Sequence, residues 1–171
     1  MERPKQNEYA PYYETYIKQL AGNDIIKILT NQLGRTVDFF KSINEDKGNY
    51  AYAEGKWSIK EVLGHMIDTE RVFSYRALCI ARREQQQLPG FEQDEYVKTA
   101  QFNKRTLSSL VNDYKLTREA DIALFKSFDE ESIGRWGTAS NNKVTVRAIM
   151  FIIAGHEEHH INILKEKYIK L

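Results

Sequence analysis

Proline, the residue that most strongly interrupts helices, is nearly absent from this chain. Its three prolines stand at positions 4, 11 and 89, so the long segments outside them are free to form continuous helices. Apolar residues in those segments recur every three or four positions, which is the period of an amphipathic helix, and no long stretch alternates with period two. The chain is therefore predicted to fold as an all-α protein.

Four long amphipathic helices are predicted, and residues 47–56 and 134–143, each with two glycines, are predicted to be loops. No such helix buries its apolar stripe alone, so a four-helix bundle is expected. The sequence marks the helices as follows: a first one capped by Asn23-Asp24 and reaching about residue 44, a second one opened by the capping box Ser58-Ile59-Lys60-Glu61 and reaching about Arg83, a third one with a stripe from Leu107 to Phe128, and a last one capped by Thr145.

The connection between the second and third helices is long. Gln85 to Gly90 breaks the second helix, and Phe91 to Lys98 is expected to form a short extra turn of helix. At about 20 residues this connection is longer than an antiparallel pair of helices needs. It therefore favours a crossover between two parallel neighbours.

Composition limits the class of protein and its partners. The 171 residues fit one domain, 1–171, and 25 basic against 24 acidic side chains give a net charge of +1, which favours neither a nucleic-acid nor a membrane partner. The single cysteine, Cys79, excludes an internal disulfide and suits a reducing compartment. No secretory signal is visible, and the longest apolar run, Ala148 to Gly155, is too short to span a bilayer. A soluble, cytoplasmic protein is expected.

Three of the four histidines occur together in the string His156-Glu157-Glu158-His159-His160. On a helix His156 and His160 lie about 40° apart on one face, so both rings reach one ion. The remaining histidine, His65, falls on the apolar stripe of the second helix. Three imidazoles from two facing helices predict a site for a divalent metal such as Zn²⁺ or Ni²⁺, with a coordination position left for water or substrate. The alternative is core histidines that each satisfy one hydrogen bond.

The same string is also an H-E-x-x-H motif, which in zinc proteases makes the glutamate, here Glu157, a general base. Ile163 and Glu166 stand where the extended motif has glycine and a third histidine, and no strand is predicted to hold a peptide, so a protease is disfavoured. Glu157 and Asp68, which follows His65 by three residues, stay candidate proton acceptors. An inter-helix ion pair for Glu157 and a surface position for Asp68 are the alternatives.

Two further groups of residues are open to more than one interpretation. Asp121 interrupts the stripe of the third helix, and a buried carboxylate there is expected to pair with Arg71, Arg76 or Arg118. Four aromatic residues at helix starts and in loops either wall a substrate cleft or close the ends of the bundle: Trp57, Tyr75, Phe91 and Trp136.

Several motifs resemble the DinB/YfiT-like family of metal-binding four-helix bundles, and the resemblance covers nearly the whole chain. They are Trp57-Ser58, the segment Gly64-His65-Met66-Ile67-Asp68-Thr69-Glu70-Arg71, Leu88-Pro89-Gly90-Phe91, and Ala154-Gly155 before the histidine string. The resemblance implies an up-down-down-up bundle, frequently a homodimer. It also implies a metal held by one histidine of the second helix and an H-x-x-x-H pair of the fourth, positions that His65, His156 and His160 occupy here.

The better understood members of that family use the metal to activate a low-molecular-weight thiol, such as bacillithiol or mycothiol. The resemblance therefore implies a metal-dependent transferase with a small thiol as cosubstrate and a small-molecule substrate. Two alternatives stay open. One is a metal-dependent hydrolase of small molecules, and the other is a non-enzymatic bundle in which the ion is structural.

Overall fold

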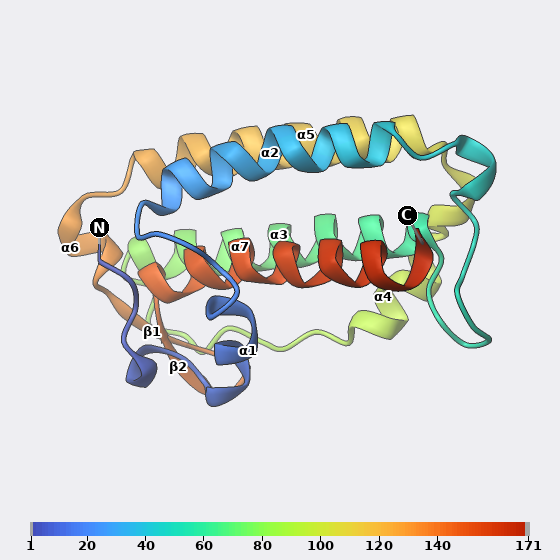
Figure 1. Cartoon of the computed structure of the whole chain (residues 1–171). Coiled ribbons are helices and arrows are strands. Elements are labelled where there is room, and N and C mark those ends of the chain that lie inside the picture. Colours follow the sequence, from blue (N-terminus) through green and yellow to red (C-terminus); the bar gives the residue numbers. More distant parts are fainter. Residues whose placement is uncertain (1, 170–171) are drawn as a thin grey trace.

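A computed structural model describes residues 2–169, which form a bundle of four long helices (Figure 1). The predicted fold class is thereby confirmed. None of the described helices is long and apolar enough to cross a membrane. The bundle helices are α2 (Ile25–Lys41), α3 (Ile59–Ala81), α5 (Leu107–Lys126) and α7 (Val146–Ile163).

The four helices have an up-down-down-up topology. In Figure 1, α2 and α7 run in one direction, whereas α3 and α5 run in the other. Both α2 and α3 contact α5 and α7. Since α3 and α5 are parallel neighbours, the chain crosses the length of the bundle between them, in a segment that carries α4 (Gln93–Ala100). The predicted crossover, with its short extra helix, is confirmed.

The predicted helix starts follow from side-chain caps. At three of them the capping oxygen accepts the backbone N–H three residues further on: Asp24 from Lys27, Ser58 from Glu61, and Thr145 from Ala148. Glu61 completes the capping box by accepting the Ser58 N–H at 2.7 Å. Such caps satisfy backbone donors that the first turn of a helix leaves free.

Residues 134–143, predicted to be a loop, instead form most of a β-hairpin. Its strands, β1 (Trp136–Ala139) and β2 (Asn142–Thr145), are antiparallel, with Trp136 opposite Thr145. Strands of four residues are too short to show an alternating pattern in the sequence. The turn residues Ser140 and Asn141 both have positive φ, 49° and 63°, as a tight hairpin turn requires.

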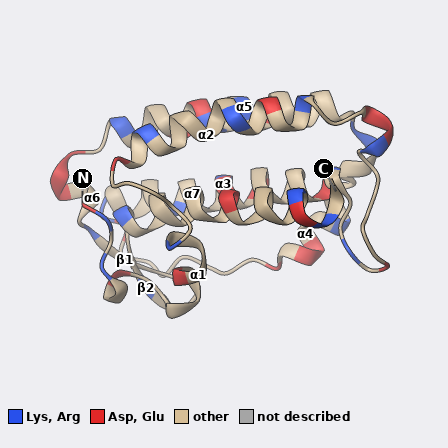
Figure 2. Ribbon diagram, viewed as in Figure 1, with Lys and Arg blue, Asp and Glu red and all other residues tan. Residues whose placement is uncertain are grey.

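Short elements complete the fold and cover one side of α7. The N-terminal segment packs on α7 through α1, and the hairpin precedes α7 directly. Basic and acidic residues are interspersed along α2 and α5 (Figure 2). The remaining short elements are η1 (Gln6–Glu8), η2 (Pro11–Tyr13), α1 (Glu14–Ile17), η3 (Glu45–Lys47), η4 (Phe102–Lys104), α6 (Glu130–Ile133) and η5 (Leu164–Tyr168).

The apolar core is divided into two clusters by a layer of buried polar side chains. One cluster lies toward the hairpin and the N-terminal segment, and the other toward the opposite end of the bundle. All four long helices contribute to the layer between them, which we call the polar layer. Its members are Gln32 and Thr36 of α2, His65, Thr69 and Glu70 of α3, Arg118 and Asp121 of α5, and His156 and Glu157 of α7.

Candidate metal centre

The three predicted ligands converge at the polar layer. The Nε2 atom of His156 lies 3.0 Å from Nε2 of His65 and 3.0 Å from Nε2 of His160. One nitrogen from each ring lies within 4.8 Å of the others. His65 and His156 are buried, and His160 is partly exposed. Three ring nitrogens from α3 and α7 therefore point to one place.

The triangle of nitrogens suits a cation better than it suits hydrogen bonds. A ring nitrogen carries either one hydrogen or one lone pair, so His156 Nε2 cannot form two full hydrogen bonds with its neighbours at once. Tetrahedral coordination with bonds of about 2.0–2.1 Å separates ligand nitrogens by ~3.3 Å. The two separations of 3.0 Å are close to that value and need only a small rotation of the rings.

Burial keeps the three imidazoles neutral, the form that binds metal ions. Burial lowers the pKa of His65 to about 4. It also holds the pKa of His156 well below its ordinary value, helped by the neighbouring rings of His160 and His65. The pKa of His160 is well below its ordinary value for the same reasons, burial first and then the rings of His65 and His159. Each ring therefore offers a lone pair without first losing a proton.

Neighbouring side chains fix the orientation of the rings. The indole of Trp57 lies against His65, with ring centroids 4.6 Å apart. The Thr69 hydroxyl is 3.4 Å from Nδ1 of His65, the nitrogen that faces away from the cluster. The Tyr16 ring contacts His156 edge-on at 5.5 Å. Packing from two other segments thus holds the rings of His65 and His156 in place.

A glycine precedes a candidate ligand on both α3 and α7 and permits close packing there. A Cβ atom at Gly155 would lie 2.6 Å from the carbonyl carbon of Tyr16, and one at Gly64 would lie 2.4 Å from the ring of Phe102. Neither distance is compatible with a side chain unless the neighbour moves. Gly155 therefore lets the N-terminal segment reach His156.

Glu157 lies in a buried ion-pair network beside the histidines. Its Oε1 accepts a hydrogen bond from Thr36 at 2.6 Å, and its Oε2 accepts from Tyr114 at 2.8 Å and from Arg118 at 2.6 Å. Arg118 also binds both carboxylate oxygens of Glu70. This is the inter-helix ion pair that the sequence offered as the alternative. The role of Glu157 as a proton acceptor stays a prediction.

The carboxylates of Glu70 and Glu157 stabilise the positive charge of Arg118. Burial alone would lower the pKa of the Arg118 guanidinium, but the adjacent Glu157 and Glu70 carboxylates raise it well above its ordinary value. Arg118 has no exposed surface, so its charge depends on those two partners. One arginine thus joins α5 to both helices that carry the histidines.

Asp121 pairs with Ser74 and not with an arginine, which corrects the sequence-based expectation. The Ser74 hydroxyl donates to Asp121 Oδ1, while Oδ2 is buried without a partner among the described residues. Arg118 is bound to Glu70 and Glu157 instead. Burial, followed by the Glu70 charge, raises the pKa of Asp121 to about 7.

Asp68 and His159 are not part of the nitrogen triangle. The Asp68 carboxylate is 3.6 Å from Arg71, and no hydrogen bond joins it to a histidine within residues 2–169. Burial raises the pKa of Asp68, with the Arg71 charge opposing. Its role as proton acceptor stays a prediction. His159 packs on the Tyr16 ring, with centroids 5.1 Å apart, and is not part of the nitrogen triangle.

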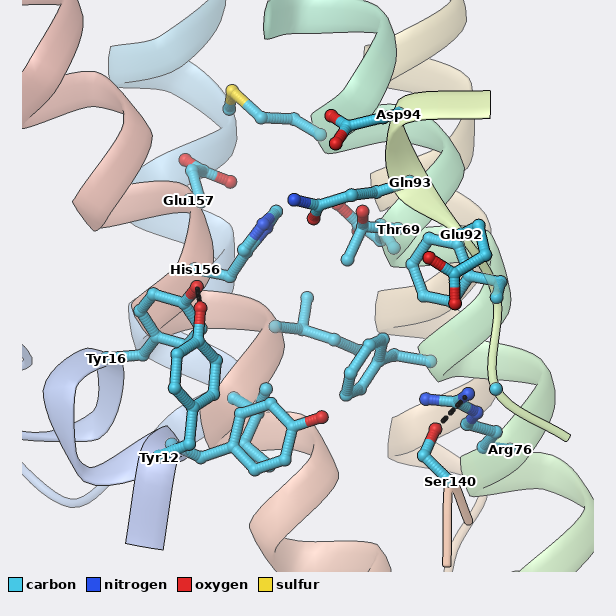
Figure 3. A pocket seen from close by; sticks show the side chains of 18 residues that line it. Tyr12, Tyr16, Thr69, Arg76, Glu92, Gln93, Asp94, Ser140, His156 and Glu157 are labelled. Carbon is cyan, nitrogen blue, oxygen red and sulfur yellow. Dashed lines mark hydrogen bonds between the residues drawn. The ribbon is translucent and has the colours of Figure 1, made fainter. Parts of the chain in front are cut away.

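A cavity of about 420 Å³ adjoins the centre. His156 lies toward one end of it, and Arg76, hydrogen-bonded to Ser140, lies toward the other (Figure 3). Phe91 is the one residue of the four predicted aromatics that lines this cavity, because Tyr75 and Trp136 are exposed and Trp57 packs on His65. The aromatic part of the lining consists of Tyr12, Tyr13, Tyr16, Phe73 and Phe91.

Residues 28–164 of the chain match the DinB superfamily. This protein is a member of the DinB superfamily. The match includes α3, α5 and α7 and all but the first three residues of α2, and it contains His65, His156 and His160. The resemblance read from the sequence motifs is therefore confirmed.

Three relatives of this DinB-superfamily protein are informative. A protein of Oceanobacillus iheyensis named "putative metal-dependent hydrolase" is 26% identical over 141 residues, which are 82% of this chain and 79% of that protein. YfiT from Bacillus subtilis, described as a probable metal-dependent hydrolase with an unusual four-helix bundle topology, has a TM-score of 0.66 and 13% identity, covering 93% of this chain and 87% of YfiT. At that identity the likeness shows the fold alone.

The third relative is the mycothiol-dependent maleylpyruvate isomerase, with a TM-score of 0.68 and 9% identity. The likeness covers 85% of this chain and 61% of that structure, so this chain spans about three fifths of the isomerase. Here too the shared feature is the fold.

Sequence reasoning missed two parts of the site. The N-terminal wall, Tyr12 to Tyr16, docks through contacts that are distant in the sequence and carry no local signal. The position of Arg76 was predictable from its spacing. It follows His65 by 11 residues, close to three helical turns, and so lies on the same face of α3.

Proposed function

We propose that this protein is a divalent-metal-dependent enzyme for the transfer of a small thiol, with His65, His156 and His160 as the metal ligands. The observation that carries the proposal is the convergence of three neutral ring nitrogens beside a cavity of about 420 Å³. A cavity of this size takes a small molecule and not a folded partner. The names of the Oceanobacillus and Bacillus relatives support metal dependence.

The ligand set fits both Zn²⁺ and Ni²⁺. Both ions accept imidazole ligands, and three of them leave a position open for a substrate atom. When bound, such an ion supplies a Lewis acid that lowers the pKa of a thiol or a water placed against it. Because His65, His156 and His160 are neutral, each ring offers a lone pair to the ion.

Thiol chemistry is favoured over hydrolysis by the state of Glu157. Hydrolysis by water is assisted by a carboxylate that is free to take a proton. Glu157 already accepts three hydrogen bonds and neutralises Arg118, so it is poorly placed to act as that base. A thiol is the more acidic group and ionises at a metal without such help. The mycothiol dependence of the structurally similar isomerase also supports this choice.

Hydrolysis of a small molecule is the second candidate. Two relatives carry the name of metal-dependent hydrolase, and Glu157 is adjacent to His156 in the chain. In this case Glu157 or Asp68 would take the proton of the attacking water. The two candidates share the metal ligands and differ in the nucleophile.

Titration of the Co²⁺-loaded protein with a small thiol separates these candidates. We expect 2-mercaptoethanol to add a saturable sulfur-to-cobalt absorption band, while ethylene glycol, its analogue without sulfur, adds none. The His65→Ala variant is expected to lose the band. His159→Ala is the matched control, because it removes a neighbouring imidazole from outside the nitrogen triangle, and it should keep the band.

Absence of a thiol band in cobalt-loaded protein, together with metal-dependent turnover of p-nitrophenyl acetate, would reject thiol transfer in favour of hydrolysis. Absence of both would favour the non-enzymatic bundle. The homodimer that the family resemblance implies stays a prediction, which light scattering of the purified protein tests.

A further inference from the structure

Arg76 is a buried cation without an acidic partner. Only 3% of the residue is exposed, yet no carboxylate of residues 2–169 lies within ion-pair distance of it. Its Nη2 donates to the Pro89 carbonyl at 2.7 Å and to the Ser140 hydroxyl at 2.9 Å. Its Nε and Nη1 form no hydrogen bond with the described residues.

Two other arginines, Arg118, which is buried, and Arg147, which is partly buried, have acidic partners. Arg118 binds Glu70 and Glu157, and Arg147 binds Glu8 at 2.6 Å. Leaving a guanidinium buried without a counter-charge is costly, so such groups are normally neutralised. Burial accordingly lowers the pKa of Arg76, whereas the charges around Arg118 raise the pKa of that residue. A counter-ion bound to Arg76 would therefore stabilise its buried charge.

The position of Arg76 indicates where the counter-ion would come from. Arg76 and His156 both line the cavity beside the metal centre, toward opposite ends (Figure 3). The rings of Phe73 and Phe91 lie 4.9 and 5.8 Å from the guanidinium carbon and form the wall next to it. A ligand in this cavity would therefore meet aromatic walls between the guanidinium and the histidines.

The spacing on α3 sets the length of such a ligand. Arg76 follows His65 by 11 residues, which places the two Cα atoms about 16 Å apart along the helix axis and within about 20° of the same face. Arg76 lines the cavity itself, whereas His65 is connected to it through His156, whose Nε2 lies 3.0 Å from that of His65. An elongated molecule, with an apolar middle part, spans the two ends.

We propose that Arg76 binds a carboxylate at the end of the substrate that lies away from the metal centre. The geometry thus assigns the substrate class as an elongated monocarboxylate. With Nη2 committed to Pro89 and Ser140, the Nε–H and Nη1–H groups of the guanidinium remain as donors, and either can give a carboxylate a charge-assisted hydrogen bond. The assignment of the opposite end to the reacting group rests on the proposed function.

A carboxylate fits this end of the cavity better than a phosphate does. Arg76 is the only Lys or Arg among the described residues that line the cavity, whereas Glu92 and Asp94 line it as well. A doubly charged phosphate at this end would have one guanidinium to neutralise it. One arginine matches one negative charge.

Calorimetric titration of the metal-free protein with octanoate, 1-octanol and octyl phosphate tests this assignment independently of the metal centre. We expect octanoate to bind about tenfold more tightly than 1-octanol, the effect of one charge-assisted hydrogen bond. Octyl phosphate should bind more weakly than octanoate. Arg76→Gln should abolish the preference for octanoate. Arg82→Gln, the same change at an exposed arginine outside the cavity, should retain it.

Several results would overturn the proposal. Equal affinity of the parent protein for octanoate and 1-octanol would do so without any variant. So would an octanoate preference that survives in a folded Arg76→Gln protein, and tighter binding of octyl phosphate would reject the carboxylate class. If Arg76→Gln does not fold, the ¹⁵N resonance of Arg76 Nε in the parent decides: octanoate must shift it, and an unmoved resonance contradicts the proposal. Since metal is absent, failure of the thiol proposal leaves these outcomes unchanged.

Discussion

The residues of the polar layer contribute unequally to the stability of the fold, and we expect Arg118 to contribute most. Its guanidinium has no exposed surface and joins three helices through Glu70 of α3 and Glu157 of α7. Removing one member of a buried ion pair leaves a charge that nothing neutralises. Because Glu157 adjoins His156 in α7, this pairing also fixes the helix that carries two of the proposed metal ligands.

Replacement of Arg118 by methionine is expected to destabilise the protein strongly. Arg118→Met leaves Glu70 and Glu157 buried without a cation, so the free energy of unfolding should fall by about 3–5 kcal/mol. Arg35→Met is the matched control, because Arg35 is exposed and its pair with Glu158 is worth about 0–1 kcal/mol. Urea denaturation measures both values. Equal, small losses in the two variants would contradict the importance of the buried network.

Asp121 is expected to make stability depend on pH. Its pKa, raised to about 7 from an ordinary 3.8, means that the folded state holds the proton more tightly than the unfolded chain. This tighter proton binding stabilises the folded state. The stabilisation is complete below pH 3.8 and is lost as pH rises through about 7. Glu70 and Ser74 of α3 and Arg118 of its own helix are the groups that face it.

Asparagine at position 121 has no proton to lose. We therefore expect Asp121→Asn to gain stability relative to the parent between about pH 5 and pH 8, as measured by urea denaturation at both values. Taking the difference between the two proteins cancels the titration of the histidines. A difference that does not change with pH would show that Asp121 ionises as an ordinary carboxyl group.

At this scale the sequence predicted which three histidines lie together, but not their surroundings. The i, i+4 spacing of His156 and His160 is a local signal, and it placed both rings on one face. The pairing of Arg118 with Glu70 depends instead on how α3 and α5 pack, which no local pattern encodes. For the same reason Asp121 was assigned an arginine and has Ser74.

At the scale of elements, the close approach of the N-terminal segment to α7 depends on Gly155. A side chain there would meet the backbone of Tyr16, which cannot move aside as a flexible side chain does. Gly34 of α2 gives the opposite case, because a Cβ atom there would have no neighbour within 4 Å. Because both glycines lie in long helices of the same bundle, Gly34 is a matched control for Gly155.

Alanine at these positions should therefore have opposite effects. Gly155→Ala should lower the free energy of unfolding by about 1–3 kcal/mol, the usual cost of overpacking. Gly34→Ala should raise it by about 0.5–1 kcal/mol, because alanine favours a helix over glycine where space is open. Thermal and urea denaturation of the two variants measure these changes. Stabilisation by Gly155→Ala would mean that the N-terminal segment does not pack as described.

The elements themselves were predictable wherever their signals are local. Caps at Asp24, Ser58 and Thr145 and the apolar stripes placed the four long helices within a few residues of their bounds. The hairpin was not predicted, because its strands of four residues are held partly by Leu88 of the crossover, which bonds to Thr138 and Ser140. The hairpin therefore depends on contacts between residues that are distant in the sequence, which a local pattern does not reveal.

At the scale of the molecule, topology brings the site together. The crossover makes α3 and α5 parallel, so α3 lies between α5 and α7 and faces both. One side of α3 then supplies His65 to the centre, and another supplies Glu70 to Arg118. The crossover and the hairpin also close the cavity through Phe91 and Ser140. The length of the crossover predicted the topology. The cavity walls could not be predicted, because they come from segments that are distant in the sequence.

The central claim is that one divalent ion binds to His65, His156 and His160 together. Elemental analysis of protein loaded with Zn²⁺ and then freed of excess ion tests it most directly. The account predicts one zinc per chain in the parent and in His159→Ala, and a near-complete loss in each of His65→Ala, His156→Ala and His160→Ala. Full zinc content in any of those three variants, or none in the parent with Zn²⁺ or with Ni²⁺, would contradict it.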